Sequence, residues 1–180
     1  MINSVNVIEN FLSIDECNSI LSRCKEDLNL SEGKVYNGNQ KDRKSLVGWI
    51  DDLGDINERL KNVLKNSYNI GGMEASGLGS FQFTQYNVGD FFKWHSDRTD
   101  VFKERFVSTV IQLNDDYVGG LLEFKNSKGE MIPIEHKIGS LYVFDSALRH
   151  RVTSVESGTR YSLVNWVSLI KSDLKKQNIL

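Results

Sequence analysis

Apolar residues recur at helical spacing near the start of the chain. They form one face of a predicted helix, at Ile14, Cys17, Leu21, Cys24 and Leu28. Ser13 precedes this face and Glu16 follows three residues later, which is the spacing of a capping box that satisfies backbone amides at a helix start. We therefore predict a helix over about 14–29.

A second helical face follows, at Leu53, Ile56, Leu60, Val63 and Leu64. It predicts a helix over about 52–69 that ends before Gly71 and Gly72. Residues 31–48, between the two predicted helices, are polar and glycine-containing and show no sustained period. This pattern predicts a long surface loop, and such loops are often functional in compact domains.

From Gly79 onward, apolar and polar residues alternate with the period of two that indicates β-strands. The strand-like runs are 80–88, 105–114, 120–124, 139–144, 150–155 and 159–169. Short strands separated by Gly, Asn and Asp turns favour a jelly-roll or cupin-like barrel over a sheet of alternating strands and helices. The predicted fold class is therefore α+β, with N-terminal helices packed on a barrel core.

The length of 180 residues fits a single domain with one sizeable core. Within it we expect a helical support region over 1–78, a jelly-roll core over 79–169 and a short tail over 170–180. Hydrophobic residues form 39% of the chain and charged residues 26%, a balance typical of a folded domain rather than a disordered chain.

The charge of the chain argues against a nucleic-acid partner. Its 22 Lys and Arg against 24 Asp and Glu give a net charge of −2, so no large basic field attracts a phosphate backbone. The sequence has no secretory leader pattern and no apolar run of about 18 residues, so we expect no membrane contact and a cytoplasmic location. Cys17 and Cys24 are about 10 Å apart in a helix, too far for a disulfide, and free thiols suit that compartment.

Two of the three histidines occupy positions suited to a metal site. His95 and Asp97 are two residues apart, so they share one side of an extended segment, and His150 opens a later strand that a barrel could bring beside them. Two imidazoles and one carboxylate form the facial triad of non-haem Fe(II) oxygenases. A surface pair or a core histidine would explain either element alone. The third histidine, His136, is predicted to lie in an exposed, solvated turn.

Arg160 follows His150 by ten residues and begins the last strand-like run. In a strand, Arg160, Ser162 and Trp166 share one face and would point into the barrel. A buried guanidinium needs an anionic partner, and a carboxylate fits its planar fork of N–H donors.

In their order and spacing, these residues resemble the 2-oxoglutarate/Fe(II)-dependent dioxygenases of the prolyl 4-hydroxylase-like branch. The motifs that carry the resemblance are His95-Ser96-Asp97, His150, Arg160 with Ser162, and Tyr86 nine residues before His95. Residues 6–21 are also similar to the N-terminal strand and helix of that branch, and residues 113–124 to its central hairpin. The fold implied by the resemblance is a double-stranded β-helix.

The resemblance implies a role for each of these residues. His95, Asp97 and His150 would bind Fe(II), and Arg160 would pair with the distal carboxylate of 2-oxoglutarate. Tyr86 would donate a hydrogen bond to this cosubstrate. The further residues expected to line the pocket are Ser108, Ser162 and Trp166.

The implied reaction is hydroxylation of a C–H bond by dioxygen, coupled to decarboxylation of 2-oxoglutarate to succinate, with ascorbate as a reductant. The expected substrate is a peptide or an amino acid, above all a peptidyl proline. Asp97 argues against halogenating members of the family, which lack a ligand carboxylate. Leu121 and Asp145 depart from the residues frequent in the branch, which affects substrate contacts rather than the iron site.

Two other functions stay open on the sequence alone. A nucleic-acid demethylase with the same iron chemistry usually has a second arginine six residues after the first, where this chain has Trp166. A non-catalytic jelly-roll binding module would use its histidines structurally or for zinc, and Arg160 paired with Ser162 counts against it.

The predicted 31–48 loop allows two interpretations of its role. Its basic residues are Lys41, Arg43 and Lys44. Such a cluster is expected to be solvated. Alternatively, this loop and residues 96–105 form a lid over a substrate, with Trp49 as an anchor.

Overall fold

The computed structural model describes residues 5–36, 38–68 and 78–168. Its larger sheet has seven strands in the order β1-β11-β7-β14-β5-β4-β2, and all neighbours are antiparallel. In that order, the strands are β1 (Asn6–Ile8), β11 (Leu141–Asp145), β7 (Arg105–Gln112), β14 (Arg160–Ser168), β5 (Phe81–Tyr86), β4 (Leu46–Ile50) and β2 (Ser31–Glu32).

The smaller sheet has five antiparallel strands in the order β10-β9-β12-β6-β3. These strands are β10 (Met131–Ile132), β9 (Leu122–Lys125), β12 (Arg149–Val152), β6 (Phe91–His95) and β3 (Arg43–Lys44). A separate two-stranded ribbon pairs β13 (Val155–Ser157) with β8 (Val118–Gly119).

The helices are α1 (Ile14–Asp27), α2 (Asp55–Tyr68) and the short 3₁₀ helix η1 (Gln40–Asp42). The predicted capping box begins α1, because Ser13 Oγ accepts from the Glu16 amide at 3.1 Å and Glu16 Oε2 accepts from the Ser13 amide at 2.7 Å. Cys17 and Cys24 are free thiols buried on the inner face of α1, as predicted.

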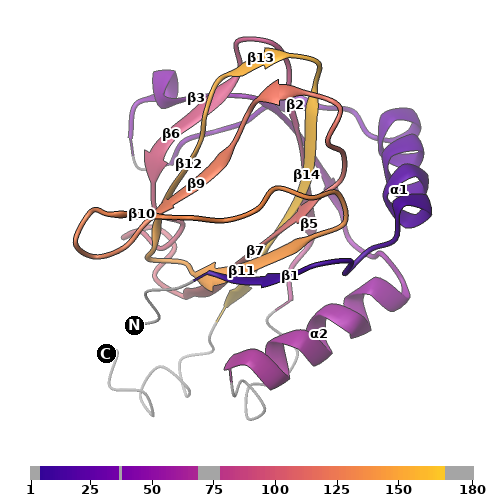
Figure 1. The fold of residues 1–180 in the computed structure, drawn as a ribbon, viewed down its shortest axis with the longest axis horizontal. Helices are drawn as coiled ribbons and strands as arrows, with labels where there is room; N and C mark the ends of the chain where they lie inside the picture. Colours follow the sequence, from indigo (N-terminus) through magenta and orange to yellow (C-terminus); the bar gives the residue numbers. More distant parts are fainter. Residues whose placement is uncertain (1–4, 37, 69–77, 169–180) are drawn as a thin grey trace.

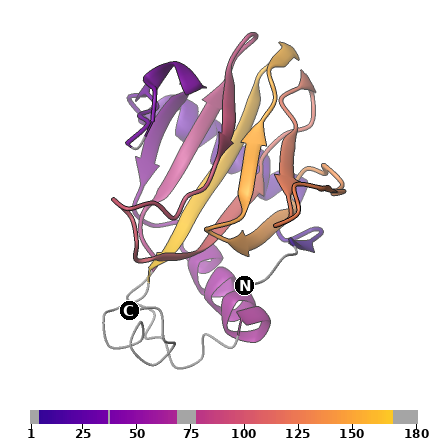
Figure 2. The same cartoon turned by 90° about the vertical axis from the view of Figure 1, so that its left-hand side faces the viewer.

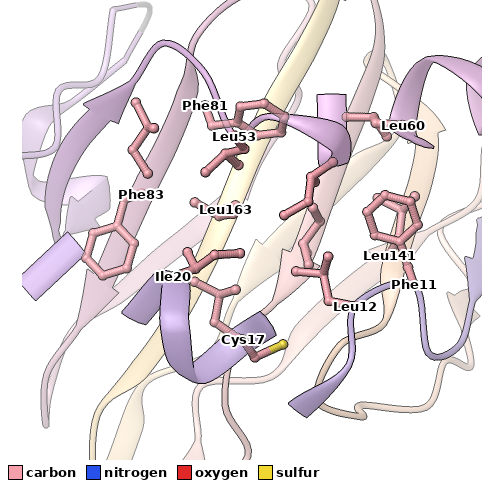
Figure 3. Packing of buried hydrophobic residues seen from close by; sticks show 14 of the residues in the cluster. Phe11, Leu12, Cys17, Ile20, Leu53, Leu60, Phe81, Phe83, Leu141 and Leu163 are labelled. Atoms are coloured by element: carbon pink, nitrogen blue, oxygen red, sulfur yellow. The ribbon is translucent and has the colours of Figure 1, made fainter. Parts of the chain in front are cut away.

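Alternation along β14 divides the interior into two cores. Leu163 and Val167 belong to a cluster in which α1 and α2 pack on one face of the seven-stranded sheet. Figure 3 shows this packing around Leu163, with Cys17 and Ile20 from α1 and Leu60 from α2. A second cluster lies between the two sheets and includes Val110, Phe124 and Phe144. The functional residues described below lie on this inter-sheet side.

The sheets and helices form layers that can be followed in the figures. In Figure 1, β6, β12 and β9 lie on the left and the two helices on the right, beyond the seven-stranded sheet. Figure 2 shows the molecule from the left-hand side of that view, with the helices behind and below the strands. Within the three described ranges, no helix is long and apolar enough to span a bilayer.

Two facing antiparallel sheets with helices on one outer face confirm the predicted α+β class with a jelly-roll core. Each predicted strand-like run overlaps at least one strand, and both predicted helices form with slightly shorter bounds. The expected tail over 170–180 and the Gly71-Gly72 helix stop lie outside the described residues. The division of the chain into support region, core and tail stays a prediction.

The 31–48 segment, predicted as a long surface loop, contains regular secondary structure instead. This segment contains β2, η1, β3 and the beginning of β4, and it contributes a strand to each sheet. The two-residue strands β2 and β3 have no visible alternation, so their existence depends on their partners: β2 pairs with β4, and β3 pairs with β6. The strand β6 was also missed, because a β-bulge between its pairings with His150 and Val152 interrupts the period of two.

Candidate functional site

Two neighbouring strands of the smaller sheet bring the predicted histidines together. His95 ends β6 and pairs with His150 of β12, so that the ring centroids lie 4.1 Å apart. Asp97 follows two residues later, with Oδ1 3.8 Å from His95 Nε2 and Oδ2 3.6 Å from His150 Nε2. The three side chains can offer ligand atoms that all lie within 4.8 Å of one another.

Backbone carbonyls orient both imidazoles toward this centre. His95 Nδ1 lies 2.8 Å from the carbonyl oxygen of Lys93, and His150 Nδ1 lies 2.9 Å from that of Leu148. Because a carbonyl only accepts, each Nδ1 must carry the proton, and each Nε2 keeps its lone pair for a metal. Phe92 stacks on His95 with centroids 3.5 Å apart and fixes the plane of the ring.

Hydroxyl groups support Asp97 from behind. Ser108 Oγ donates to Asp97 Oδ2 at 2.6 Å, and Ser146 Oγ lies 2.8 Å from Ser108 Oγ. Burial alone would raise the pKa of Asp97, but the two neighbouring histidines and the Ser108 hydroxyl bring the pKa below its ordinary value. The carboxyl group is therefore ionised at neutral pH, as a metal ligand must be.

His95 also has the protonation state that a metal requires. Burial, with the nearby His150, lowers the pKa of His95 to about 3, so its imidazole is neutral at pH 7. Two neutral imidazoles and one carboxylate suit Fe(II) and leave coordination positions open. This donor set fits the metal that the sequence resemblance implies. Across residues 5–36, 38–68 and 78–168, it is the one group of three such side chains close enough to share an ion.

The three residues line a cavity of about 470 Å³ between the sheets. The face of β14 predicted to point inward also lines it, with Arg160, Ser162, Val164 and Trp166. The opposite face of the strand carries Leu163 and Val167 into the helix-side core. Alternation along one strand thus places a charged side chain inside the protein.

Arg160 is only 1% exposed and is held by neutral groups. Its Nη1 donates to Ser162 Oγ at 3.2 Å and its Nη2 to Gln112 Oε1 at 3.0 Å, while its buried Nε has no partner. No carboxylate within the described residues pairs with this guanidinium. A buried unpaired charge is costly, so the pocket suits an anion such as the distal carboxylate of 2-oxoglutarate.

Gln112 is a functional residue that the sequence analysis missed. It lies opposite Ser162 in the pairing of β7 with β14. Its Nε2 donates to the Asn114 carbonyl oxygen at 2.7 Å and to Tyr117 Oη at 2.6 Å, which leaves Oε1 for Arg160. The available signal was a lone amide between the apolar residues of a strand, which indicates a buried hydrogen-bonded group.

The other predicted cosubstrate residues divide into two groups. Tyr86 lies opposite Arg160 in the pairing of β5 with β14, and its ring centroid is 5.6 Å from the guanidinium carbon. Tyr86, Ser162 and Trp166 all line the cavity. Ser108 is fully buried and does not line the cavity. Its hydroxyl instead donates a hydrogen bond to the Asp97 carboxylate.

His136 lies outside the metal group, as predicted, but the expectation of a solvated side chain is wrong. Its ring is half-buried near Tyr142, and its Nδ1 is buried without a hydrogen-bond partner. Burial and the nearby Arg160 guanidinium lower its pKa. Charged neighbours in the sequence suggested exposure, but the tertiary fold covers the ring.

Aromatic and cationic side chains form a stack along one wall of the cavity. Tyr36 contacts Phe102 edge-on with centroids 5.2 Å apart, and the Arg105 guanidinium carbon lies 3.9 Å from the Phe102 centroid and 4.0 Å from that of Trp166. The ring centroids of Trp49 and Trp166 lie 6.3 Å apart. All five residues line the cavity.

The expectation that the basic cluster of Lys41, Arg43 and Lys44 is solvated is wrong for Arg43. It lines the cavity, donates from Nε to Ser45 Oγ at 2.8 Å and from Nη2 to Gln82 Oε1 at 3.0 Å, and lies over the ring of Phe92. Lys44 instead pairs with Asp90 at 3.0 Å and is mostly exposed.

Comparison with known proteins agrees with this geometry. The sequence profile of the 2OG-Fe(II) oxygenase superfamily matches residues 81–168, which include all the predicted metal and cosubstrate residues. A PKHD-type hydroxylase of Thermosynechococcus vestitus is 28% identical over 94% of this chain and 81% of its own length.

Solved structures with low sequence identity share the fold. A prolyl-4-hydroxylase of Pseudomonas putida superposes with a TM-score of 0.72 at 23% identity, over 92% of both chains. A prolyl hydroxylase of Trichoplax adhaerens was solved with a hypoxia-inducible-factor peptide fragment. It superposes with a TM-score of 0.75 at 18% identity, over 99% of this chain and 87% of the Trichoplax chain. They confirm the double-stranded β-helix that the resemblance implied.

The family match and the PKHD-type relatives indicate an enzyme and count against the alternative of a non-catalytic binding module. The His-Asp-His group and the arginine pocket fit the two cofactors that the family name states. These matches and the geometry of the site indicate a 2OG-Fe(II) oxygenase of the prolyl 4-hydroxylase-like kind, with Fe(II) and 2-oxoglutarate as its cofactors.

Proposed function

We propose that this enzyme hydroxylates a C–H bond of a peptide residue, most directly a proline, with Fe(II) held by His95, Asp97 and His150. The observation that carries the proposal is the convergence of these three ligand atoms in a cavity that also contains the buried, unpaired Arg160. Iron bound there, together with 2-oxoglutarate and dioxygen, supplies the oxidation of a substrate C–H bond with formation of succinate.

The chain's own residues position the reactants. The Arg160 guanidinium receives the distal carboxylate of 2-oxoglutarate, and Gln112 and Ser162 hold the guanidinium in place. Tyr86, opposite Arg160, donates a hydrogen bond to the same cosubstrate. The inter-sheet apolar cluster, which includes Phe124, excludes water from this end of the site.

A peptide substrate is supported by the cavity wall and by a relative. The Trichoplax adhaerens enzyme was solved with a peptide fragment. In this chain, Trp49 is 51% exposed and Tyr36 is 64% exposed beside the cavity, so both rings are available to an extended segment. Proline suits such a groove because its φ is fixed and it has no backbone N–H to satisfy.

The metal assignment is tested by measuring bound iron and succinate formation in three variants. His95→Ala and His150→Ala should each lose Fe(II) and activity, because neither leaves a complete facial triad. His136→Gln serves as the control and should keep both, since His136 is outside the group. Full iron stoichiometry in His95→Ala or His150→Ala would refute the assignment.

The substrate class is tested with a panel of proline-containing peptides and methylated oligonucleotides, incubated with Fe(II), 2-oxoglutarate and ascorbate. We expect one added oxygen on peptides, detected by mass spectrometry, and succinate in equal amount. Demethylation of the oligonucleotides with unreactive peptides would replace this proposal by the demethylase alternative.

A further inference from the structure

The ionisable residues of the cavity are unbalanced in charge. The cations that line it are Lys34, Arg43, Arg105 and Arg160, and the carboxylates are Glu32 and Asp97. The whole chain, in contrast, carries a net charge of −2. The cavity therefore has an excess of positive charge in a protein whose overall charge is negative.

The proposed cofactors do not remove this excess. The two charges of Fe(II) and the two carboxylates of 2-oxoglutarate cancel, and Asp97 offsets Arg160 within the same site. Lys34, Arg43 and Arg105 are then opposed by Glu32 alone, which is exposed. The surplus lies in the part of the cavity that the cofactors do not use.

Arg105 is held between two aromatic rings. Its guanidinium carbon lies about equally close to two rings, 3.9 Å from Phe102 and 4.0 Å from Trp166. These contacts hold the guanidinium but do not occupy its N–H donors. Among the described residues, the Arg105 side chain forms no hydrogen bond and no ion pair.

The position of Arg105 makes a missing anion costly. Burial lowers its pKa while the field of Asp97 opposes that change, and a guanidinium stays protonated in any case. A partly buried charge without a partner gains free energy when an anion arrives with matching geometry. Asp97 is not that partner, because its carboxylate oxygens lie against His95, His150 and Ser108 and form no ion pair with Arg105.

Arg43 presents a second guanidinium to the same cavity. It donates to Ser45 and Gln82, which are neutral, and it lies 4.8 Å from the centroid of Phe92, the ring that stacks on His95. It has no carboxylate partner in the described part of the chain. Two of its five N–H donors are used, so others remain for a ligand.

We infer that the substrate carries a carboxylate next to the residue that is oxidised, and that Arg105 recognises it with Arg43 in support. This inference rests on the proposed peptide hydroxylation and gives it a substrate class: proline flanked by an aspartate or a glutamate. A free amino acid would offer the same chemistry through its α-carboxylate. The two sources are separate arms of the test.

Binding is measured by fluorescence anisotropy without oxygen, in the presence of Fe(II) and 2-oxoglutarate, so that no turnover is needed. The probes are labelled peptides that differ only beside one proline, which is flanked by Asp, Asn or Lys. In a second arm, unlabelled L-proline and L-prolinamide compete with the labelled Asp peptide. The wild-type enzyme should bind the Asp peptide at least about tenfold tighter than the Asn peptide, and the Lys peptide most weakly.

Arg105→Met keeps an unbranched side chain against both rings and removes the charge. It should reduce the preference for Asp over Asn to within about threefold, and Arg43→Met should reduce it less. The matched control is Arg149→Met, which removes an exposed arginine that precedes His150 and does not line the cavity. This control should keep the tenfold preference.

Several results would overturn the inference. They are equal binding of the Asp and Asn peptides by the wild type, a preference for Lys, no binding of any carboxylate probe, or an unchanged preference in Arg105→Met. Displacement of the labelled Asp peptide by L-proline but not by L-prolinamide would assign the carboxylate to a free amino acid. Failure of the proposed function is distinguishable, because it appears as absence of iron binding or of succinate in the wild type.

Discussion

Arg160 is a buried guanidinium whose two hydrogen-bonded partners, Ser162 and Gln112, are both neutral. Its geometry is fixed before any ligand arrives, because Gln112 is itself held by Asn114 and Tyr117. A preorganised charge of this kind loses little entropy when it binds a carboxylate. The binding energy of the cosubstrate should therefore depend strongly on this one side chain.

Arg160→Ala should raise the KM for 2-oxoglutarate at least about tenfold, because loss of one partner of a buried charge pair costs roughly 2–5 kcal/mol. Arg160→Lys should have a smaller effect, since an ammonium keeps the charge but loses the planar fork. Steady-state succinate formation over a range of 2-oxoglutarate concentrations measures both. An unchanged KM in Arg160→Ala would move the cosubstrate site elsewhere.

His136 makes the stability of the protein sensitive to acid. Burial, together with the Arg160 guanidinium, lowers its pKa in the folded state below the ordinary value of 6.5. At pH values below about 6.5 the unfolded chain therefore binds more protons than the folded one at this residue. The free energy of unfolding decreases as the pH is lowered. His136→Gln should lose less stability than the wild type between about pH 7.5 and about pH 5.5. Urea denaturation at both pH values measures this, and an equal loss in the two proteins would contradict it.

The junction between α1 and the sheets depends on a glycine in the left-handed region. Gly139 has φ of 75°, and its carbonyl oxygen accepts from the Leu12 amide at 3.0 Å, while its own amide donates to the Gln112 carbonyl at 2.8 Å. A Cβ at this position would lie 2.1 Å from the Leu12 carbonyl oxygen. The glycine thus joins the segment before α1 to the end of β7.

Gly139→Ala should destabilise the fold by more than about 1 kcal/mol, from the left-handed backbone strain and, in addition, the clash. Gly129→Ala is a matched control, because Gly129 has φ of 83° but no atom within 4 Å of a Cβ. Thermal or urea unfolding of both variants separates strain from clash. Equal destabilisation by the two substitutions would show that the close approach to Leu12 is unimportant.

Sequence patterns predicted the elements that depend on local rules. The capping box at Ser13 follows from hydrogen bonding within one segment. The alternation of side chains between the two sheet faces along the predicted run 159–169 follows from pleat geometry, so both could be foreseen. The strands β2 and β3 each have two residues and form only by pairing with β4 and β6, which are not joined to them by a tight turn. No periodicity can reveal such elements.

The same distinction applies to the site. The residues that could be selected from the sequence are His95, Asp97, His150 and Arg160, because their order and spacing together match a known family although each alone has common structural roles. Gln112, Ser146 and Arg105 acquire their roles only from contacts across strands, and Arg43 was expected in solvent. Their residue types carry no distinctive chemistry without those contacts.

The candidate site connects the two sheets of the molecule. His95 and His150 belong to the smaller sheet, while Asp97 is hydrogen-bonded to Ser108 of the larger one. Arg98, next to Asp97, donates to the carbonyl oxygens of Arg105 and Phe106 and pairs with Asp145 at 3.1 Å. A metal on the three ligands would therefore connect the sheets at the point where the chain passes between them.

This arrangement predicts that ligands stabilise the whole fold. Mn(II), which suits the same ligands without redox chemistry, should raise the Tm when added with 2-oxoglutarate. At 100 times the dissociation constant, one bound ligand adds about 2.7 kcal/mol, which corresponds to roughly 5–11 °C for a domain of this size. Thermal unfolding followed by fluorescence measures the shift, and a chelator should reverse the part due to the metal.

Two variants separate the contributions of metal and cosubstrate to that shift. His95→Ala should show no increase in Tm with Mn(II), because two remaining ligands bind the ion weakly. Arg160→Ala should keep the metal-dependent increase but lose the further increase from 2-oxoglutarate, since its metal ligands are intact while the distal carboxylate has no partner. A full Mn(II) shift in His95→Ala would place the ion outside the facial triad, and a full 2-oxoglutarate shift in Arg160→Ala would place the cosubstrate away from β14.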